Sequence, residues 1–299
     1  MKTLESQTSK GSESLAESKA ELLKMVAELE ATRTNPIDFR GVAGCEDVDI
    51  IKDVKAVQEK EAAIATKVSE LRGTEKDIYE DSKLVESLLC TCIRESNWLG
   101  EDAEVILASL YDDYFRGIDT IAELKGTEPE GRHVGFSIDF TMSPDTIATK
   151  LTKTVESIAK GFTPSVKYFN SPSMGKFRNF KMAKVVLGAD YPSVKRLADA
   201  YVEAHASGKP ISEVLVNDPI QFVLLDEIRG QLQALRNIAY EQFNNRQAGA
   251  IYHKTLMTFM GVMAKRGITE EMMRSKSRGD TMHSRILSMI GKFDREAKR

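Results

Sequence analysis

Two segments decide the fold: Gly117-Ile118-Asp119-Thr120-Ile121-Ala122-Glu123-Leu124 and His133-Val134-Gly135-Phe136-Ser137-Ile138-Asp139-Phe140-Thr141. Each predicts a β-strand with a carboxylate near its middle, because side chains alternate between the two faces of a strand. The linker over residues 125–132 contains glycine and proline, which is typical of a hairpin loop. A hairpin that is symmetric about Pro129 places Asp119 directly opposite Asp139. Like charges there repel, so we expect a bound cation between them.

The chemistry of this acid pair points to a divalent metal. Mg²⁺ or Mn²⁺ takes hard oxygen ligands, and two carboxylates plus a backbone carbonyl such as that of Phe140 supply half a coordination shell. The alternative is that both acids lie on the solvated outer face of a two-layer sheet. Gly135 and Ser137 share the face of Asp139, and small residues beside an acid favour a concave site that a ligand approaches closely.

Other acids compete for a role in this site. Glu95 shares a helical face with apolar residues of the predicted helix 75–96. It is therefore a candidate third metal ligand, the alternative being that the helix frays and Glu95 is solvated. Asp112 and Asp113 favour a solvated turn over a ligand role. Glu123 and Lys125 mimic a Glu-x-Lys motif, but Glu123 lies about 13 Å from Asp119 along the strand. In a hairpin centred on Pro129 the pair lies near the turn and away from Asp139, so Glu123 ranks below Asp139.

Composition bounds the class of protein. The chain has 299 residues, 41% of them hydrophobic and 29% charged, which suffices for a sizeable core in one or two domains. The net charge of −3 gives no global attraction to nucleic acid or lipid. No apolar run is long enough to predict a membrane span. Residues 1–13 are polar, which predicts disorder and no signal peptide. Three cysteines give no disulfide framework, so we expect a cytoplasmic protein.

The order of predicted elements gives an α/β fold. We expect a central mixed sheet of about five strands flanked by helices, with an N-terminal helical arm and C-terminal helices. The segment 183–189 is almost continuously apolar, which predicts a central strand. The strands are predicted at residues 103–109, 117–124, 133–141, 165–169 and 183–189, and the helices at residues 15–31, 48–71, 75–96, 144–160, 192–205, 219–243 and 247–265.

The sequence divides into a helical arm (residues 14–72), a core (residues 75–266) and a tail (residues 267–299). The tail is basic and rich in methionine, and this composition predicts a loose amphipathic helix. In the arm, apolar residues from Ile50 to Leu71 recur at alternating steps of four and three, interrupted only by Glu61. That pattern predicts either a helix pair packed on its own domain or self-association into a homo-oligomer.

The arrangement resembles the PD-(D/E)XK nuclease superfamily, whose core is a helix, a three-stranded meander, a helix and a further strand. The resemblance covers about residues 85–190. It implies that Asp119 is the acid of the first half-motif, Asp139 the (D/E) of the second, and Glu95 the acid on the preceding helix. It also implies a restriction-endonuclease-like core and Mg²⁺- or Mn²⁺-dependent hydrolysis.

One position departs from the family pattern: Thr141 stands where the motif has its lysine. Members of the superfamily relocate this lysine to the next helix. Here that helix is predicted from Pro144, and it carries Lys150 and Lys153, so the resemblance implies that one of them is the catalytic lysine.

Basic residues that suit a phosphate backbone follow the predicted core strands. Lys167, Lys176, Arg178, Lys181 and Lys184 are interleaved with tyrosine and phenylalanine, as in proteins that contact nucleic acid. The alternative is a solvated edge strand and loop. Gln221, Gln231 and Tyr240 weakly match a glutamine and a tyrosine that some superfamily members place near the substrate.

The sequence therefore predicts a metal-dependent nuclease, with DNA favoured over RNA as the substrate and the choice between them left open. No P-loop, dinucleotide fingerprint or nucleophile elbow occurs, which argues against those enzyme classes. The rival hypothesis is a non-catalytic assembly protein, in which the arm and tail are the working parts on a degenerate core. Thr141 at the lysine position favours this rival.

Overall fold

The computed structural model describes residues 21–42, 46–72, 74–126, 133–215, 218–277 and 279–297. Within these stretches no helix combines the length and the apolar character that a bilayer crossing requires. Cys90 and Cys92 are buried and free, as predicted, and Cys45 lies outside the described residues, as does the predicted disordered segment 1–13.

Four strands form a mixed sheet in the order β1-β2-β3-β6. They are β1 (Glu104–Leu107), β2 (Thr120–Lys125), β3 (His133–Thr141) and β6 (Ala183–Gly188). The first three form an antiparallel meander, and β6 pairs parallel with β3. Two further strands, β4 (Ser165–Ser171) and β5 (Gly175–Lys181), form a separate hairpin. The α/β class and the mixed sheet are confirmed, but the expected five-stranded sheet is wrong, because residues 165–169 belong to this hairpin.

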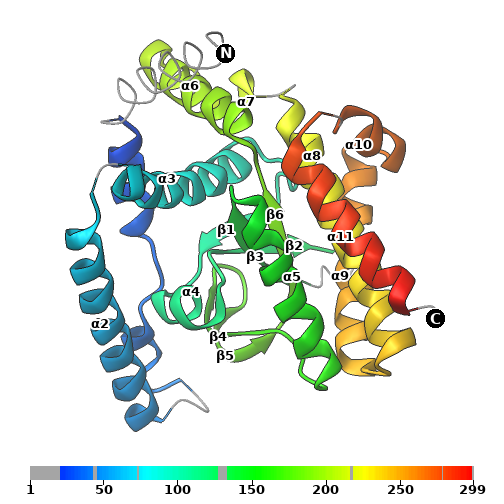
Figure 1. Ribbon diagram of the computed structural model, residues 1–299, viewed down its shortest axis with the longest axis horizontal. Helices are drawn as coiled ribbons and strands as arrows, with labels where there is room; N and C mark the ends of the chain where they lie inside the picture. Colours follow the sequence, from blue (N-terminus) through cyan, green and yellow to red (C-terminus); the bar gives the residue numbers. More distant parts are fainter. Residues whose placement is uncertain are drawn as a thin grey trace.

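Helices surround the sheet, and Figure 1 shows α3 on one side of it and α8 to α11 on another. The helical elements are the segment 21–30, η1 (Pro36–Phe39), α2 (Asp47–Glu70), α3 (Thr74–Glu95), α4 (Leu110–Arg116), α5 (Pro144–Ala159), α6 (Tyr191–Ser207), α7 (Ile211–Val214), α8 (Pro219–Asn237), η2 (Ile238–Gln242), α9 (Arg246–Lys265), α10 (Glu270–Lys276) and α11 (Thr281–Ala297). The prediction lacks η1, α4, α7 and the strand β5. The tail is not loose, because α11 buries Met282, Ile286 and Ile290 against α5 and β6.

The hairpin register is the one predicted from the sequence. Thr120 pairs with Ile138 and Lys125 with His133, so β2 and β3 are symmetric about residue 129. The turn, residues 127–132, lies outside the described residues. Asp119 does not sit in the middle of a strand as expected but immediately before β2.

Within the described residues β6 is an edge strand, not the central strand that its apolar run predicts. Side chains from α8 and α9 take the place of a further strand. Gln231 donates to the carbonyl of Val186 (2.6 Å) and accepts from its N–H (2.7 Å). The hydroxyl of Tyr252 donates to the carbonyl of Lys184 (3.1 Å) and accepts from its N–H (3.3 Å). The strand is apolar because helices cover it, and its backbone groups are satisfied despite its position.

Both faces of the sheet are covered. On one face, Phe136 and Ile138 enter the main core. On the other, Ile121 lies in an apolar cluster with Val166 and Phe169 of β4. The two predicted carboxylates lie on this second face with only 7% and 4% of their surface exposed. The alternative of a solvated outer face is therefore wrong.

The N-terminal segments pack on their own chain. The segment 21–30 contributes its buried side chains to the main core. In α2, Ile50 lies in a cluster with Phe39 and Tyr168, and the Tyr168 hydroxyl donates to Asp53 at 2.5 Å. The later half of α2 is less covered, since Ile64 is partly exposed. Self-association through the arm stays a prediction.

Candidate active site

A cavity of about 700 Å³ opens at the end of the sheet where β2 begins, between α3, α4 and α5. Both predicted carboxylates, Asp119 and Asp139, line it, and so do both predicted lysines, Lys150 and Lys153. The structure thus brings together four of the five side chains predicted for catalysis and metal binding.

The Asp119 carboxylate is fixed by the neighbouring strand. Its Oδ2 accepts from the backbone N–H of Phe140 at 2.6 Å. Burial, together with repulsion from Glu86, Asp139 and Asp113, raises the pKa of Asp119 well above its ordinary value, although Lys150 opposes the shift. Asp119 is therefore a buried carboxyl group among other acids, as a site that attracts a cation requires.

The Asp139 carboxylate lies between two ammonium groups. Lys150 contacts Oδ1, and the amine of Lys184 lies 3.0 Å from Oδ2. The Lys184 amine also donates to the carbonyls of Arg116 (2.9 Å) and Gly117 (2.6 Å). Lys184 faces the cavity because it pairs with Ser137 in the register of β3 and β6, on the same strand face as Asp139.

Lys150 reaches back from α5 to the acid pair, as the relocation hypothesis requires. Its amine donates to Asp139 and to the carbonyl of Phe140 (2.5 Å). Burial acts to lower the pKa of Lys150, but the charges of Asp139 and Asp119 and the hydrogen bond to Asp139 outweigh it and raise the pKa. Lys150 is therefore an ammonium ion at neutral pH. Lys153, one turn later, lines the same cavity with an exposed side chain.

Thr141, at the position of the motif lysine, forms hydrogen bonds with residues at the start of α5. Its hydroxyl accepts from the N–H of Ser143 at 3.1 Å and contacts the Thr146 hydroxyl at 2.5 Å. Ser143 is the N-cap residue, as predicted, but its own side chain makes no capping bond. The threonine thus fixes the turn that leads from β3 into α5, and α5 carries the lysine.

Gly117 allows the end of α4 to lie close to the carboxylate of Asp139. It ends α4 in the left-handed region (φ 58°), which suits glycine. A Cβ at this position would lie 3.2 Å from Asp139 Oδ2 and 3.4 Å from the Lys184 amine. Only a residue without a side chain leaves this contact undisturbed.

Two further acids line the cavity: Glu86, which the sequence analysis missed, and Asp113, which it assigned to a solvated turn. Glu86 of α3 lines the wall, and burial raises its pKa against the opposing charge of Lys83, 3.0 Å away. Asp113 of α4 is bound by Lys83 (3.2 Å) and Arg33 (3.4 Å). The solvated turn expected at Asp112 and Asp113 is wrong, since Asp112 is fully buried.

Glu95 is not brought to this cavity, which corrects its prediction as a third ligand. Its side chain is 40% exposed and pairs with Arg94 at 3.1 Å. Glu86 precedes it by nine residues, about 13 Å along the helix axis, and occupies the wall instead. Glu123 is also elsewhere, where its carboxylate accepts from Ser171 (2.6 Å) and Ser173.

Four of the five predicted basic residues, Lys167, Lys176, Arg178 and Lys181, lie on the β4–β5 hairpin, and none of these four lines the cavity. Lys167 pairs with Asp53 and Arg178 with Asp49 (2.6 Å), so these two bind α2 to the hairpin. The amines of the other two reach the carbonyl of Asp38 (Lys176) and the side chain of Gln247 (Lys181), each at 2.7 Å. Nucleic-acid binding by this set stays a prediction, whereas Lys184 belongs to the cavity.

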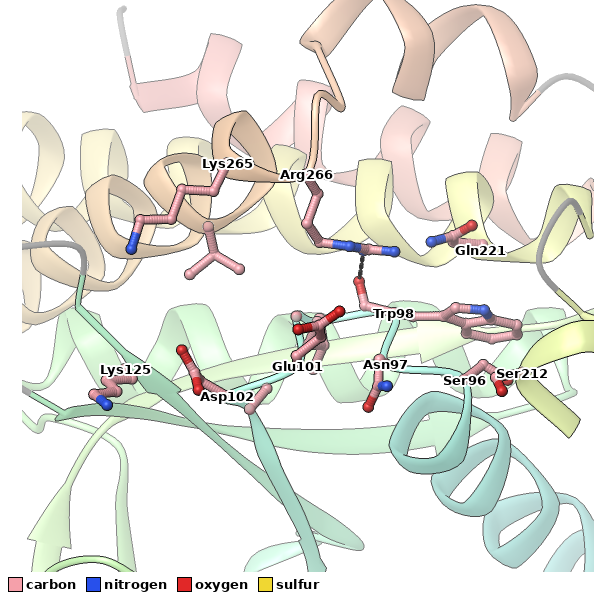
Figure 2. A pocket seen from close by; sticks show the side chains of 14 residues that line it. Ser96, Asn97, Trp98, Glu101, Asp102, Lys125, Ser212, Gln221, Lys265 and Arg266 are labelled. Atoms are coloured by element: carbon pink, nitrogen blue, oxygen red, sulfur yellow. Dashed lines mark hydrogen bonds between the residues drawn. The ribbon is translucent and has the colours of Figure 1, made fainter. Parts of the chain in front are cut away.

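A second cavity, of about 490 Å³, lies at the other end of β2. Figure 2 shows Arg266 donating to the carbonyl of Trp98, with Lys125, Glu101 and Gln221 around the same space. Its charges are mixed, and it contains neither predicted carboxylate. Of the other weakly matched residues, Gln231 is engaged by β6 and Tyr240 is 40% exposed with its ring against Gly249.

The chain was compared with protein-family models, curated proteins and solved structures. No protein-family model, no curated protein and no solved structure matches this chain.

Proposed function

We propose that this chain is a nuclease of the PD-(D/E)XK type, with a restriction-endonuclease-like core, that hydrolyses phosphodiester bonds of DNA with Mg²⁺ or Mn²⁺. The observation that carries the proposal is the meeting of Asp119, Asp139 and Lys150 in one cavity large enough for a phosphodiester group. We also propose a reducing, cytoplasmic setting, because the two described thiols, Cys90 and Cys92, are buried and free.

The donor set of the cavity fits a hard divalent cation. Its described lining contains carboxylates and no cysteine or histidine, which disfavours zinc. The described residues gather no group of three or more His, Cys, Asp or Glu that could hold a metal. Mg²⁺ needs fewer, since one or two carboxylates plus water and substrate phosphate complete its shell. Asp119 and Asp139 would hold the ion, and a bound cation activates water and neutralises phosphate charge.

Lys150, Lys184 and Gly117 have separate roles in the proposed site. The Lys150 ammonium, held at the carbonyl of Phe140, is positioned to donate a hydrogen bond to a phosphate oxygen. Lys184 is anchored by two carbonyls and holds the second oxygen of Asp139 in place. Gly117 keeps this side of the cavity open.

The test is single-turnover cleavage of a 30-nucleotide DNA labelled at its 5′ end. Cleavage is expected with Mg²⁺ or Mn²⁺ and not with EDTA. Asp119→Asn and Lys150→Gln should lower the rate on the order of 100-fold or more, as loss of a catalytic group does. Asp145→Asn is the matched control, because Asp145 is an exposed residue of α5 outside the cavity lining. Equal rates for wild type and Asp119→Asn would refute the proposal.

The non-catalytic assembly function is the second candidate, and the exposed apolar residues of α2 favour it. Val48 is 76% and Ile51 52% exposed. A chain that forms a stable oligomer, cleaves no nucleic acid and shows no thermal shift with Mn²⁺ would belong to this class.

A further inference from the structure

Two phenylalanine side chains stand exposed in the lining of the cavity that contains Asp119 and Asp139. Phe115 is 47% and Phe162 63% exposed, and both line the same space as Asp119 and Asp139. Burying a phenylalanine contributes about 1.5–3 kcal/mol to folding, so leaving two exposed in one cavity forgoes that gain. Exposed apolar groups gathered at a cavity are typical of a binding surface.

Both rings are presented by a fixed backbone. Phe115 lies on α4, and its ring centroid is 5.0 Å from that of Tyr111. At Phe162 the N–H donates to the carbonyl of Ser157 (3.0 Å), and the carbonyl accepts from the side chain of Asn245 (3.1 Å). The main chain of Phe162 is therefore held at both ends while its side chain faces solvent.

Cations accompany the rings. Lys153 lines the cavity from α5, and no ion pair ties it to any other described residue. Lys150 and Lys184 lie deeper, on Asp139. By contrast, Lys167 and Arg178 of the β4–β5 hairpin are already paired with α2. Lys153 thus supplies a positive charge in the same cavity lining as the two exposed rings.

Rings and cations together match one ligand class. Aromatic side chains stack on nucleobases while cations follow the phosphates, and each stacked base contributes about 1–3 kcal/mol. Base faces are covered by their neighbours in a duplex, so stacking on a protein requires unpaired bases. We propose that the cavity takes single-stranded nucleic acid, with bases stacked on Phe115 and Phe162 and a backbone phosphate at Lys153. This inference rests on the proposed nuclease function and names its substrate class.

The test is fluorescence anisotropy in EDTA, so that binding is measured without cleavage. The probes are fluorescein-labelled dT₁₂, rU₁₂ and a 12-base-pair duplex. A single-stranded probe is expected to bind at least tenfold more tightly than the duplex. Phe115→Ala and Phe162→Ala should each weaken binding of that probe about tenfold, and Phe162→Tyr should restore it. Met257→Ala is the control, because Met257 is 57% exposed on α9 and outside the cavity lining.

Duplex binding as tight as single-strand binding overturns the inference, and so does single-strand affinity unchanged in both alanine variants with folding verified by melting. Failure of the inference and failure of the nuclease function are separable. Metal-dependent cleavage of duplex DNA that Phe162→Ala leaves unchanged would retain the nuclease and remove the single-strand preference. Phenylalanine-dependent binding of single strands without cleavage in Mg²⁺ or Mn²⁺ would do the reverse.

Discussion

Replacing the two acids of the cavity one at a time should change stability in opposite directions. In Asp119→Asn, the amide keeps an oxygen for the N–H of Phe140 and loses the charge that Glu86, Asp113 and Asp139 repel. In Asp139→Asn, the ammonium groups of Lys150 and Lys184 lose the carboxylate that lies between them. The first change removes a repulsion and the second removes an attraction.

The magnitudes follow from burial. Removing one partner of a buried ion pair costs about 3–5 kcal/mol. Lys150 and Lys184 keep backbone carbonyls as partners, so Asp139→Asn should cost about 3 kcal/mol, at the lower end. Asp119→Asn should raise the free energy of unfolding by on the order of 1 kcal/mol, because it removes the repulsion while the hydrogen bond from Phe140 is retained. At about 2 °C per kcal/mol for a chain of this size, the melting temperatures should move by about −6 °C and +2 °C.

The gain in folding stability from Asp119→Asn should increase as the pH rises. Burial and acid repulsion raise the pKa of Asp119 in the folded state, whereas the unfolded value is about 3.9. The folded wild type therefore holds its proton longer and loses stability as pH rises from about 4 through the folded pKa. Asparagine has no such loss, so its advantage is absent at low pH and grows toward neutrality.

The assay is urea unfolding followed by circular dichroism at pH 4.5, 6.0 and 7.5 in EDTA, for wild type, both variants and Asp145→Asn as a surface control. The order of stability at pH 7.5 should be Asp119→Asn, then wild type and control together, then Asp139→Asn. Destabilisation by both cavity variants to the same extent, or a gain from Asp119→Asn that is largest at pH 4.5, would refute the electrostatic reasoning.

Three further results are expected. Tyr252→Phe should lower the free energy of unfolding by about 1–3 kcal/mol, since both backbone groups of Lys184 lose a buried partner. Chemical denaturation measures this loss, and an unchanged free energy of unfolding would contradict the prediction by showing that water replaces the tyrosine hydroxyl. Gly117→Ala should lower the melting temperature and slow cleavage, because the added Cβ meets Asp139 and the backbone is left-handed; unchanged kinetics would show that the contact is tolerated. Mn²⁺ at 100 times its dissociation constant should stabilise the wild type by about 2.7 kcal/mol in thermal melts, and EDTA should reverse this; an equal shift in Asp119→Asn would place the ion elsewhere.

The acid pair was predictable because its geometry is set by local rules. The register of β2 and β3 followed from a loop placed symmetrically about residue 129, and β-pairing then fixed Asp119 near Asp139. The choice between Lys150 and Lys153 was not predictable, because both were expected only from the resemblance, which places the motif lysine on the next helix. The structure shows that Pro144 starts this helix close to the strand end and that Lys150 returns to the carbonyl of Phe140.

Other features depend on tertiary contacts that a single sequence does not encode locally. Glu86 and Glu95 lie on the same helix, and only the crossing of α3 over the sheet decides which of them reaches the cavity. The apolar run of β6 indicated burial correctly but not position, because Gln231 and Tyr252 replace the missing neighbour strand. Lys184 carried a readable signal, since it is a lysine in an otherwise apolar strand.

The central claim is that Asp119 and Asp139 share one divalent cation. The most direct measurement is anomalous X-ray diffraction from crystals grown with Mn²⁺. The account predicts one strong peak about 2.1 Å from an oxygen of each carboxylate, with the Lys150 amine turned toward the open side of the cavity. A crystal that shows Mn²⁺ at the second cavity or nowhere, with both lysines still on Asp139, would contradict it.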